Sequence, residues 1–298
     1  MRQVRSTVLF LCAFIFAAYA PATIAQGQSA LSVLDLHFQI GTPPMVAAHR
    51  AGPAKNIPEN SLAAIKRSLN NGYHMIEIDV NNTRDGEMVL FHDKSLNRTM
   101  GISGRFNSYT YDQLKNIPLL DYQKNTTDSY IPTLDQAFSL LQDKNIIVEI
   151  DLKDNRLFPR ILDKVKRYGL EKNVLFIAYT METALAWQKA APWVYVSFAF
   201  EDIDALKQAK VQGLDLKRVI AWMGLDTLNA PLVQAVHAMG IKTVFGTIGT
   251  SQTSWDRKIG RTYPICHYKT FTDQGADIIV TAKPSSVLSV ISGRANCG

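Results

Sequence analysis

The stretch Met45-Val46-Ala47-Ala48-His49 is a short apolar run that ends in a histidine, and similar runs recur to the end of the chain. An amphipathic segment, Asn60–Asn70, separates it from the next run, which ends in Asp79. The expected strands are Met45–His49, Met75–Asp79, Met88–His92, Ile146–Asp151, Val174–Ala178, Val194–Phe198, Val219–Trp222, Lys242–Phe245 and Asp277–Thr281. Because strands that alternate with helical crossovers run parallel, the chain is predicted to be an α/β protein.

Helical periodicity fills most intervals between these runs. The expected helices are Asn60–Asn70, Leu134–Leu141, Arg160–Tyr168, Thr183–Lys189, Ile203–Val211 and Leu228–Met239. Asn60 is expected to cap the first of them. Eight or nine strands in roughly 250 residues favour a (β/α)8 TIM barrel. An open sheet usually carries a glycine-rich loop after its first strand, and none is present. One strand candidate is therefore in excess, and we expect it to be Val219–Trp222.

One interval departs from the alternation. Val80–Glu87 is too short for a crossover helix and contains the turn signal Asp85-Gly86, so its flanking runs form a hairpin or are neighbours joined without a helix. The polar segment Lys94–Tyr130 follows, with one short helical candidate at Tyr111–Ile117. We expect a single domain over residues 40–298, with a small loop excursion after the third strand.

The N-terminus has the layout of a secretory signal. Met1–Arg5 is basic, Val8–Ala20 is apolar, and small residues follow. The apolar stretch is short for a membrane span and has no basic flank on its far side, so we expect no stable membrane anchor. The prediction is a signal peptide over residues 1–25, cleaved between residues 25 and 30, and an exported protein that is periplasmic or secreted.

The charge balance is mildly basic. The formal net charge of +6 falls to about +4 when Arg2 and Arg5 leave with the signal. This suits anionic substrates, but no lysine-arginine run of a nucleic-acid binder is present, so nucleic acid is excluded as a partner. The oligomeric state is left open. Loss of the signal also leaves Cys266 and Cys297, and we expect a disulfide between them because exported thiols are oxidised.

Carboxylates suited to a metal ion follow two of the apolar runs. Glu77 and Asp79 are two residues apart in a strand, so both side chains point to one face. Two carboxylates on one face repel each other unless a cation lies between them, and oxygen ligands favour a hard ion such as Mg²⁺ or Ca²⁺. Glu149, Asp151 and Lys153 also share one face. Either acid can supply a third metal ligand, while Lys153 neutralises a phosphate.

Two histidines close strand candidates beside charged neighbours. His49 precedes Arg50, and His92 precedes Asp93. Two histidines on either side of a phosphodiester make an acid-base pair, in which one accepts a proton from the nucleophile and the other protonates the leaving oxygen. Arg50 can grip the phosphate and stabilise its developing charge. Glu59 can orient Arg50 or join the metal ligands.

The ordered set of these motifs resembles the glycerophosphodiester phosphodiesterase family, distant relatives of the phosphatidylinositol phospholipases C. The matching residues are His49-Arg50, Pro58-Glu59-Asn60, Glu77 and Asp79, Asp85-Gly86, His92-Asp93, Leu96–Thr99, Ile131–Leu134, Glu149–Lys153, Gly275–Thr281 and Pro284. The resemblance implies a TIM barrel and metal-assisted hydrolysis of glycerophosphodiesters to glycerol phosphate and an alcohol. It also implies that His49 and His92 are the acid-base pair, Glu77 and Asp79 metal ligands, and Arg50 a phosphate contact.

The chain departs from the family pattern at four places. Ala51 stands where glycine usually follows His-Arg, and Asp151-Leu152-Lys153 replaces Glu-x-Lys, which makes Asp151 the favoured third ligand and Glu149 the alternative. Val244–Thr247 replaces a tryptophan motif, and Ala282 replaces an aspartate. We therefore predict a metal-dependent phosphodiesterase acting on a small-molecule phosphodiester. The alternatives are a phosphodiesterase for inositol or other head-group diesters, or a non-catalytic phosphodiester-binding barrel.

Overall fold

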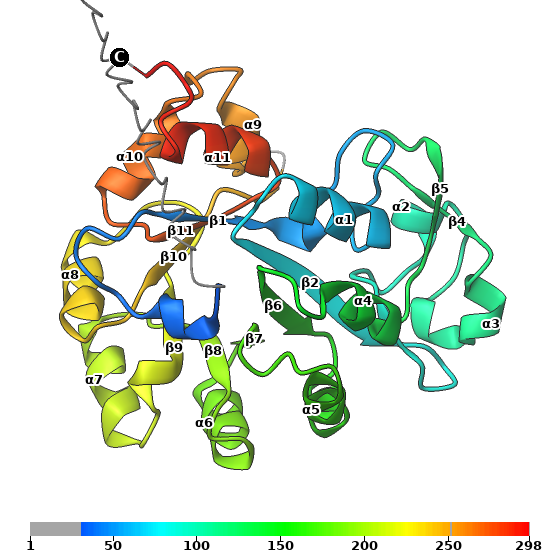
Figure 1. The fold of residues 1–298 in the computed structure, drawn as a ribbon, viewed down its shortest axis with the longest axis horizontal. Helices are drawn as coiled ribbons and strands as arrows, with labels where there is room; N and C mark the ends of the chain where they lie inside the picture. Colours follow the sequence, from blue (N-terminus) through cyan, green and yellow to red (C-terminus); the bar gives the residue numbers. More distant parts are fainter. Residues whose placement is uncertain (1–30, 251, 298) are drawn as a thin grey trace, which may run out of the picture.

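A computed structural model describes residues 31–250 and 252–297, and in this part of the chain eight parallel strands close into a barrel with helices outside it (Figure 1). The barrel strands are β1 (Met45–Ala48), β2 (Met75–Asn82), β6 (Ile147–Leu152), β7 (Val174–Ala178), β8 (Tyr195–Ala199), β9 (Val219–Trp222), β10 (Thr243–Gly246) and β11 (Ile278–Thr281). Pairing of β1 with both β2 and β11 closes the barrel. The predicted TIM barrel is confirmed.

The helices that cover the barrel follow its strands in turn. They are α1 (Leu62–Asn70), α4 (Leu134–Leu141), α5 (Phe158–Arg167), α6 (Met181–Ala190), α7 (Ile203–Val211), α8 (Ala230–Ala238), α10 (His267–Asp273) and α11 (Pro284–Ile291). Within the described ranges, no helix combines the length and apolar character needed to cross a membrane. The predicted signal peptide, residues 1–25 with cleavage between residues 25 and 30, lies outside the described residues.

The expectation that Val219–Trp222 is the surplus strand is wrong. This segment is β9, and it pairs in parallel with both β8 and β10. The surplus run is instead the third one, where β3 (Met88–Leu90) pairs antiparallel with the outer end of β2, Val80 opposite Leu90. The turn at Asp85-Gly86 is too short for a parallel crossover, so of the two arrangements left open the hairpin forms.

The excursion after β3 is more structured than the sequence predicts. It contains α2 (Asn97–Met100), α3 (Tyr111–Leu114), and an antiparallel pair formed by β4 (Pro118–Leu120) and β5 (Thr126–Tyr130). It has a small apolar cluster of its own, made of Val89, Phe91, Leu96, Met100, Phe106, Leu114, Leu119 and Ile131. Figure 1 shows it beside α1, away from the helices that follow β7, β8 and β9.

The interior of the barrel changes from apolar to charged along its strands. Near the amino ends, Met75, Ile147, Leu175 and Tyr195 form a buried cluster, which the short 3₁₀ helix Val33–Leu36 closes from below. Alternate residues of β2 and β6 above this layer are carboxylates, in register as Glu77 beside Glu149 and Asp79 beside Asp151. The apolar cluster fills the amino ends of the strands, and the four acids lie toward the carboxyl ends.

A disulfide joins Cys266, just before α10, to Cys297, with the Cα atoms 5.5 Å apart. It connects the segment that follows β10 to the end of the chain after α11.

Candidate active site

A left-handed turn after β1 positions His49 and Arg50. Arg50, Ala51 and Gly52 have φ angles of 53°, 63° and 77°. Gly52 is required there, because a Cβ atom would come within 2.8 Å of Ser68 Oγ in a conformation that already favours glycine. Ala51 adopts a conformation that costs a non-glycine residue about 1–2 kcal/mol. The turn aims the backbone N–H of Arg50 at Glu77 Oε2, 2.7 Å away.

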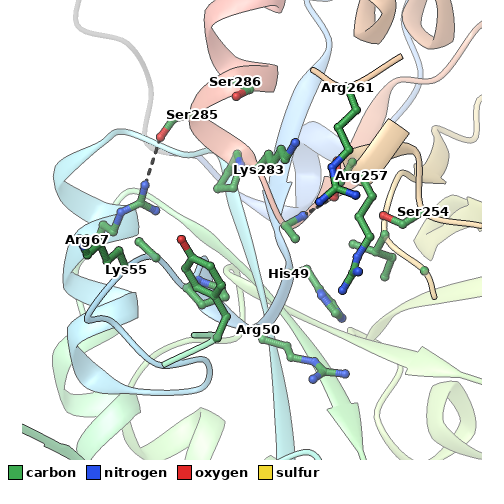
Figure 2. Close-up of a pocket in the computed structure, with 18 of the residues that line it drawn as sticks. His49, Arg50, Lys55, Arg67, Ser254, Arg257, Arg261, Lys283, Ser285 and Ser286 are labelled. Carbon is green, nitrogen blue, oxygen red and sulfur yellow. Dashed lines mark hydrogen bonds between the residues drawn. The ribbon is translucent and has the colours of Figure 1, made fainter. Parts of the chain in front are cut away.

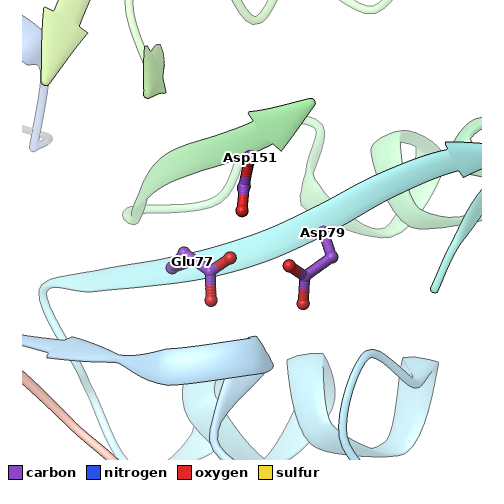
Figure 3. A group of neighbouring side chains, drawn as sticks. All are labelled: Glu77, Asp79 and Asp151. Carbon is purple, nitrogen blue, oxygen red and sulfur yellow. The ribbon is translucent and has the colours of Figure 1, made fainter. Parts of the chain in front are cut away.

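Three carboxylates from two neighbouring strands converge at the mouth of the barrel. Each of Glu77, Asp79 and Asp151 offers an oxygen, and these atoms all lie within 4.8 Å of one another (Figure 3). All three residues are buried. Parallel pairing of β2 with β6 brings Asp151 beside Asp79, which the sequence spacing alone did not establish.

The carboxylates are held by three neighbours. Asn60 Nδ2 donates to Asp79 Oδ2 at 2.6 Å, so Asn60 is not the helix cap expected from the sequence; Ser61 caps α1. The ammonium group of Lys153 lies between Asp79 Oδ1, at 2.6 Å, and Asp151 Oδ2, at 2.5 Å. The Tyr179 hydroxyl donates to Asp151 Oδ2 at 2.9 Å.

The three acids fit a divalent cation. In the described structure, the buried Oδ1 atom of Asp151 has no hydrogen-bond partner. Burial, and next the charge of Asp79, raise the pKa of Glu77 well above its ordinary value. Buried carboxylates that crowd one another and leave an oxygen free form the oxygen-rich set that Mg²⁺ and Ca²⁺ prefer.

Glu149 lies one step deeper in the barrel than Asp151. Its side chain is 2 % exposed, and its Oε1 atom has no hydrogen-bond partner among the described residues. Burial raises the pKa of Glu149 to about 7, although a hydrogen bond from Ser197 acts in the opposite direction. The converging triad includes Asp151 rather than Glu149, so the geometry places the favoured third ligand with Glu77 and Asp79.

A chain of charge-assisted hydrogen bonds connects the second histidine to Arg50. His92 Nδ1 is 2.7 Å from Asp93 Oδ1, and Asp93 accepts from Arg98 Nε at 2.7 Å. Arg98 also donates to both oxygens of Glu59, which accepts from Arg50 Nη1 at 2.8 Å. Glu59 therefore contacts Arg50, the first of the two roles proposed for it, and is not part of the carboxylate triad.

His49 is held in its neutral form. Its Nε2 atom lies 3.9 Å from Glu77 Oε2, and 23 % of its side chain stays exposed. Burial, followed by the positive charge of Arg50, lowers the pKa of His49 to about 3. The imidazole is therefore neutral at physiological pH, and a neutral imidazole has one ring nitrogen that can accept a hydrogen bond.

One cavity collects these groups. A space of about 640 Å³ is lined by His49, Arg50, Glu77, Asp79, His92, Glu149 and Asp151. Within the described chain its lining does not include Lys153 or Glu59. Both lie against residues that do line it, Lys153 on the carboxylates and Glu59 on Arg50.

Sequence reasoning missed several residues of this site. Arg98 was recognised only as part of a family motif, and Tyr179 was not singled out at all. Asp256 was also missed; it does not line this cavity, but it is 3 % exposed and accepts a hydrogen bond from the backbone N–H of Ala282 at 2.7 Å. Ala282 stands where the family pattern has an aspartate, and here the carboxylate of Asp256 reaches the end of β11 from a different segment. The signal for Asp256 is weak, because it follows no apolar run.

Barrels of this kind act at the carboxyl ends of their strands, and the two histidines, Arg50 and the carboxylate triad gather at that end. The model of the Glycerophosphoryl diester phosphodiesterase family matches residues 49–254. A glycerophosphodiester phosphodiesterase of Caldanaerobacter subterraneus subsp. tengcongensis is 32% identical over 163 residues, which cover 53% of this chain and 67% of that protein. The chain belongs to the glycerophosphoryl diester phosphodiesterase family, and its enzyme class is that of a phosphodiesterase.

Solved structures bear on the fold. A glycerophosphoryl diester phosphodiesterase from Parabacteroides distasonis superposes with a TM-score of 0.77 at 24% identity, covering 89% of this chain and 92% of that one. A phosphodiesterase from Oleispira antarctica, solved with the product sn-glycerol-3-phosphate, has a TM-score of 0.63 at 24% identity and covers 84% of this chain and 97% of that one.

Proposed function

We propose that the protein hydrolyses glycerophosphodiesters to glycerol phosphate and an alcohol, with one divalent ion, Mg²⁺ or Ca²⁺, and with His49 and His92 as its acid-base pair. The observation that carries this proposal is that both histidines and the Glu77–Asp79–Asp151 triad line a single cavity. The family match over residues 49–254 and the name of the relative described above support the same reaction.

In this proposal the triad holds the ion, whose positive charge stabilises the anionic phosphate. Arg50, oriented by Glu59, donates to a non-bridging phosphate oxygen. Lys153 keeps the carboxylates of Asp79 and Asp151 in place and adds positive charge on the phosphate side.

The two histidines move protons. Neutral His49 accepts the proton of the attacking hydroxyl, from the substrate's glycerol or from water, as the new P–O bond forms. His92, oriented through Nδ1 by Asp93, gives a proton from its other nitrogen to the alcohol oxygen as the old P–O bond breaks. When the glycerol hydroxyl attacks first, water then opens the resulting cyclic phosphate with the proton transfers reversed.

The test is release of glycerol phosphate from a panel that includes glycerophosphocholine and glycerophosphoinositol, with Mg²⁺, with Ca²⁺ and with EDTA. Metal-dependent release supports the proposal. Preference for the inositol diester assigns the protein to the head-group alternative. Binding of the diesters without metal-dependent turnover identifies a non-catalytic barrel and overturns the proposal.

We further propose that the protein is exported, periplasmic or secreted. The basic and apolar N-terminal sequence and the pairing of Cys266 with Cys297 support export, because disulfides persist in oxidising compartments. N-terminal sequencing of the protein recovered outside the cytoplasm should give a mature chain that begins within residues 26–30. An intact Met1 on the active protein would contradict this.

A further inference from the structure

A second and larger pocket adjoins the catalytic cavity. It encloses about 890 Å³ and shares His49, Arg50, Ile248 and Gly249 with that cavity. Its remaining walls come from the loop after the left-handed turn, from α1, from Arg98 and Tyr122 of the excursion after β3, from the segment around α9 (Trp255–Lys258) and from the start of α11. A substrate bound at His49 therefore has open space beside it in this direction. His92 is not part of the lining in the described structure, so the pocket lies on the His49 side of the phosphodiester.

The pocket wall carries an excess of positive charge. Lys55, Arg67, Arg257, Arg261 and Lys283 line it from four separate segments (Figure 2). Over residues 31–250 and 252–297, no ion pair joins any of these five side chains to a carboxylate. Arg50 and Arg98 also line the pocket but are paired with acids of the site. We call these five cations the basic wall; none of them has a carboxylate partner in this part of the chain, although Lys283 Nζ donates to the carbonyl oxygen of Ile259 at 3.1 Å.

The acid that borders the basic wall does not neutralise it. Asp256 is buried, and its Oδ1 atom accepts hydrogen bonds from the hydroxyls of Thr247, Tyr268 and Thr281. Its Oδ2 atom accepts from the backbone N–H of Ala282. These neutral donors hold the carboxylate in place, and in the described residues it forms no ion pair with the basic wall, so one acid faces five cations and the pocket keeps an excess of positive charge.

Part of the basic wall is held in a fixed geometry. Arg67 donates from Nη1 to the carbonyl oxygen of Gly52 at 3.1 Å and from Nη2 to Ser285 Oγ at 3.2 Å. Figure 2 shows this second bond, and it also shows the Arg257 side chain extending in the direction of His49. Ser285 and Ser286 add hydroxyl donors to the same wall.

We propose that this pocket binds a second phosphate group of the substrate, carried by the arm of the diester that lies on the His49 side. The substrate class is then a glycerophosphodiester with an additional terminal phosphate. Several unpaired cations match the charge of about −1.5 to −2 of a phosphate monoester better than that of a single carboxylate. Arginine forks bind phosphate oxygens in pairs. This inference rests on the proposed phosphodiesterase function and specifies its substrate.

The experiment compares two substrates on the full mature chain with its divalent metal. One is glycerophosphocholine, and the other is glycerophosphoglycerol that carries a terminal phosphate. The wild-type protein should have a higher kcat/KM for the phosphorylated substrate, through a lower KM, and the preference should shrink as salt is raised. Arg257→Ala/Arg261→Ala should lower kcat/KM for that substrate about tenfold or more and leave glycerophosphocholine within about threefold.

A matched control removes the same charge elsewhere. Arg84 and Arg105 are exposed and line neither pocket, so Arg84→Ala/Arg105→Ala should keep the wild-type preference. Equal kcat/KM for the two substrates in the wild type, or equal losses on both in the Arg257/Arg261 variant, would overturn the inference. Failure of the proposed function itself gives a different result: no metal-dependent cleavage of the diester bond in either substrate.

A further arm separates a soluble phosphate from a membrane surface. Vesicles of phosphatidylglycerol and of phosphatidylcholine are sedimented with the wild type and with Arg257→Ala/Arg261→Ala. If the basic wall serves the substrate, the two proteins sediment alike. Wild-type binding to the anionic vesicles that is lost in the variant, with no preference for the phosphorylated substrate, would assign these cations to a lipid surface and contradict the inference.

Discussion

Arg98 donates from Nη1 and Nη2 to both oxygens of Glu59, at 2.7 and 2.6 Å. The same guanidinium donates from Nε and Nη2 to Asp93, at 2.7 and 2.8 Å. One arginine of the excursion after β3 therefore supports the partner of His92 and the partner of Arg50 at once. The two halves of the proposed catalytic machinery therefore depend on one side chain, which acts on His92 through Asp93 and on Arg50 through Glu59.

Arg98→Ala should lower kcat/KM for glycerophosphocholine by roughly 10–100-fold, the usual loss when a residue that orients site residues is removed. Both Glu59 and Asp93 would lose their bidentate donor, so Arg50 and His92 would be less well oriented. Steady-state kinetics at saturating metal is the measurement. Arg105→Ala, which removes an exposed arginine of the same excursion, should stay near the wild-type rate. An unchanged kcat/KM in Arg98→Ala would show that the network does not position the site.

The same network should make part of the stability depend on pH. Burial raises the pKa of Asp93 and of Glu59, but hydrogen bonds from His92 and Arg98 to Asp93, and from Arg98 to Glu59, outweigh it and leave both values below normal. Lowered folded-state values stabilise the fold above the unfolded values near pH 4, and this contribution is lost as the pH falls toward the folded-state values.

The wild type should therefore be more resistant to urea than Arg98→Met at pH 7, and the difference should narrow from about pH 5 to pH 2. The measurement is the unfolding midpoint of both proteins as a function of pH. A difference that stays constant over that range would mean that Arg98 stabilises the fold by packing rather than through these carboxyls.

Most of the barrel could be predicted from apolar runs, because each buried parallel strand is a short continuous run followed by a helical period. The error at β9 has a physical cause: an apolar run does not reveal its pairing direction. Met88–Leu90 and Val219–Trp222 are both short apolar runs, yet β3 pairs antiparallel with β2, whereas β9 is a parallel strand of the barrel wall. The only difference visible in the sequence is that the interval before Met88 is too short for a crossover helix.

Site residues at the ends of strands could be predicted from the sequence. Residues that reach the site from loops or short helices could not. The acids on β2 and β6 could be predicted because residues two apart in a strand point to the same face. Arg98 and Asp256 lie on the short helices α2 and α9, whose contacts with the site depend on how long loops fold back. The cap of α1 is Ser61, one residue after the predicted Asn60. Both residue types are good caps, so the sequence did not distinguish them.

Removal of either histidine should reduce turnover by roughly 10²–10⁴-fold, the range for loss of a general acid or base. His49→Ala and His92→Ala are compared with His37→Ala, which alters a histidine that precedes β1 and lines neither the catalytic cavity nor the pocket with the basic wall. Rates of glycerol phosphate release at saturating metal are measured for all three. A near-normal rate in either of the first two variants would rule out its acid-base role.

Asp151→Asn should weaken metal binding more than Glu149→Gln does. Asp151 belongs to the converging triad with Glu77 and Asp79, whereas Glu149 lies a step deeper in the barrel and outside that triad. Calorimetric titration with Mg²⁺ and Ca²⁺ gives the dissociation constants of the two variants and the wild type. A larger loss in Glu149→Gln would transfer the third ligand position to Glu149.

The Cys266–Cys297 disulfide should stabilise the fold without taking part in the reaction. It closes a loop with a sequence separation of 31 residues, for which chain entropy predicts about 3–4 kcal/mol of unfolding free energy. Neither cysteine lines the catalytic cavity or the pocket with the basic wall. Cys266→Ser/Cys297→Ser should therefore unfold at lower urea than the wild type while keeping its kcat, and dithiothreitol should lower the midpoint of the wild type but not of the variant. A variant as stable as the wild type, or a midpoint of the wild type that does not respond to reductant, would show that the bond contributes nothing to the stability of the C-terminal segment.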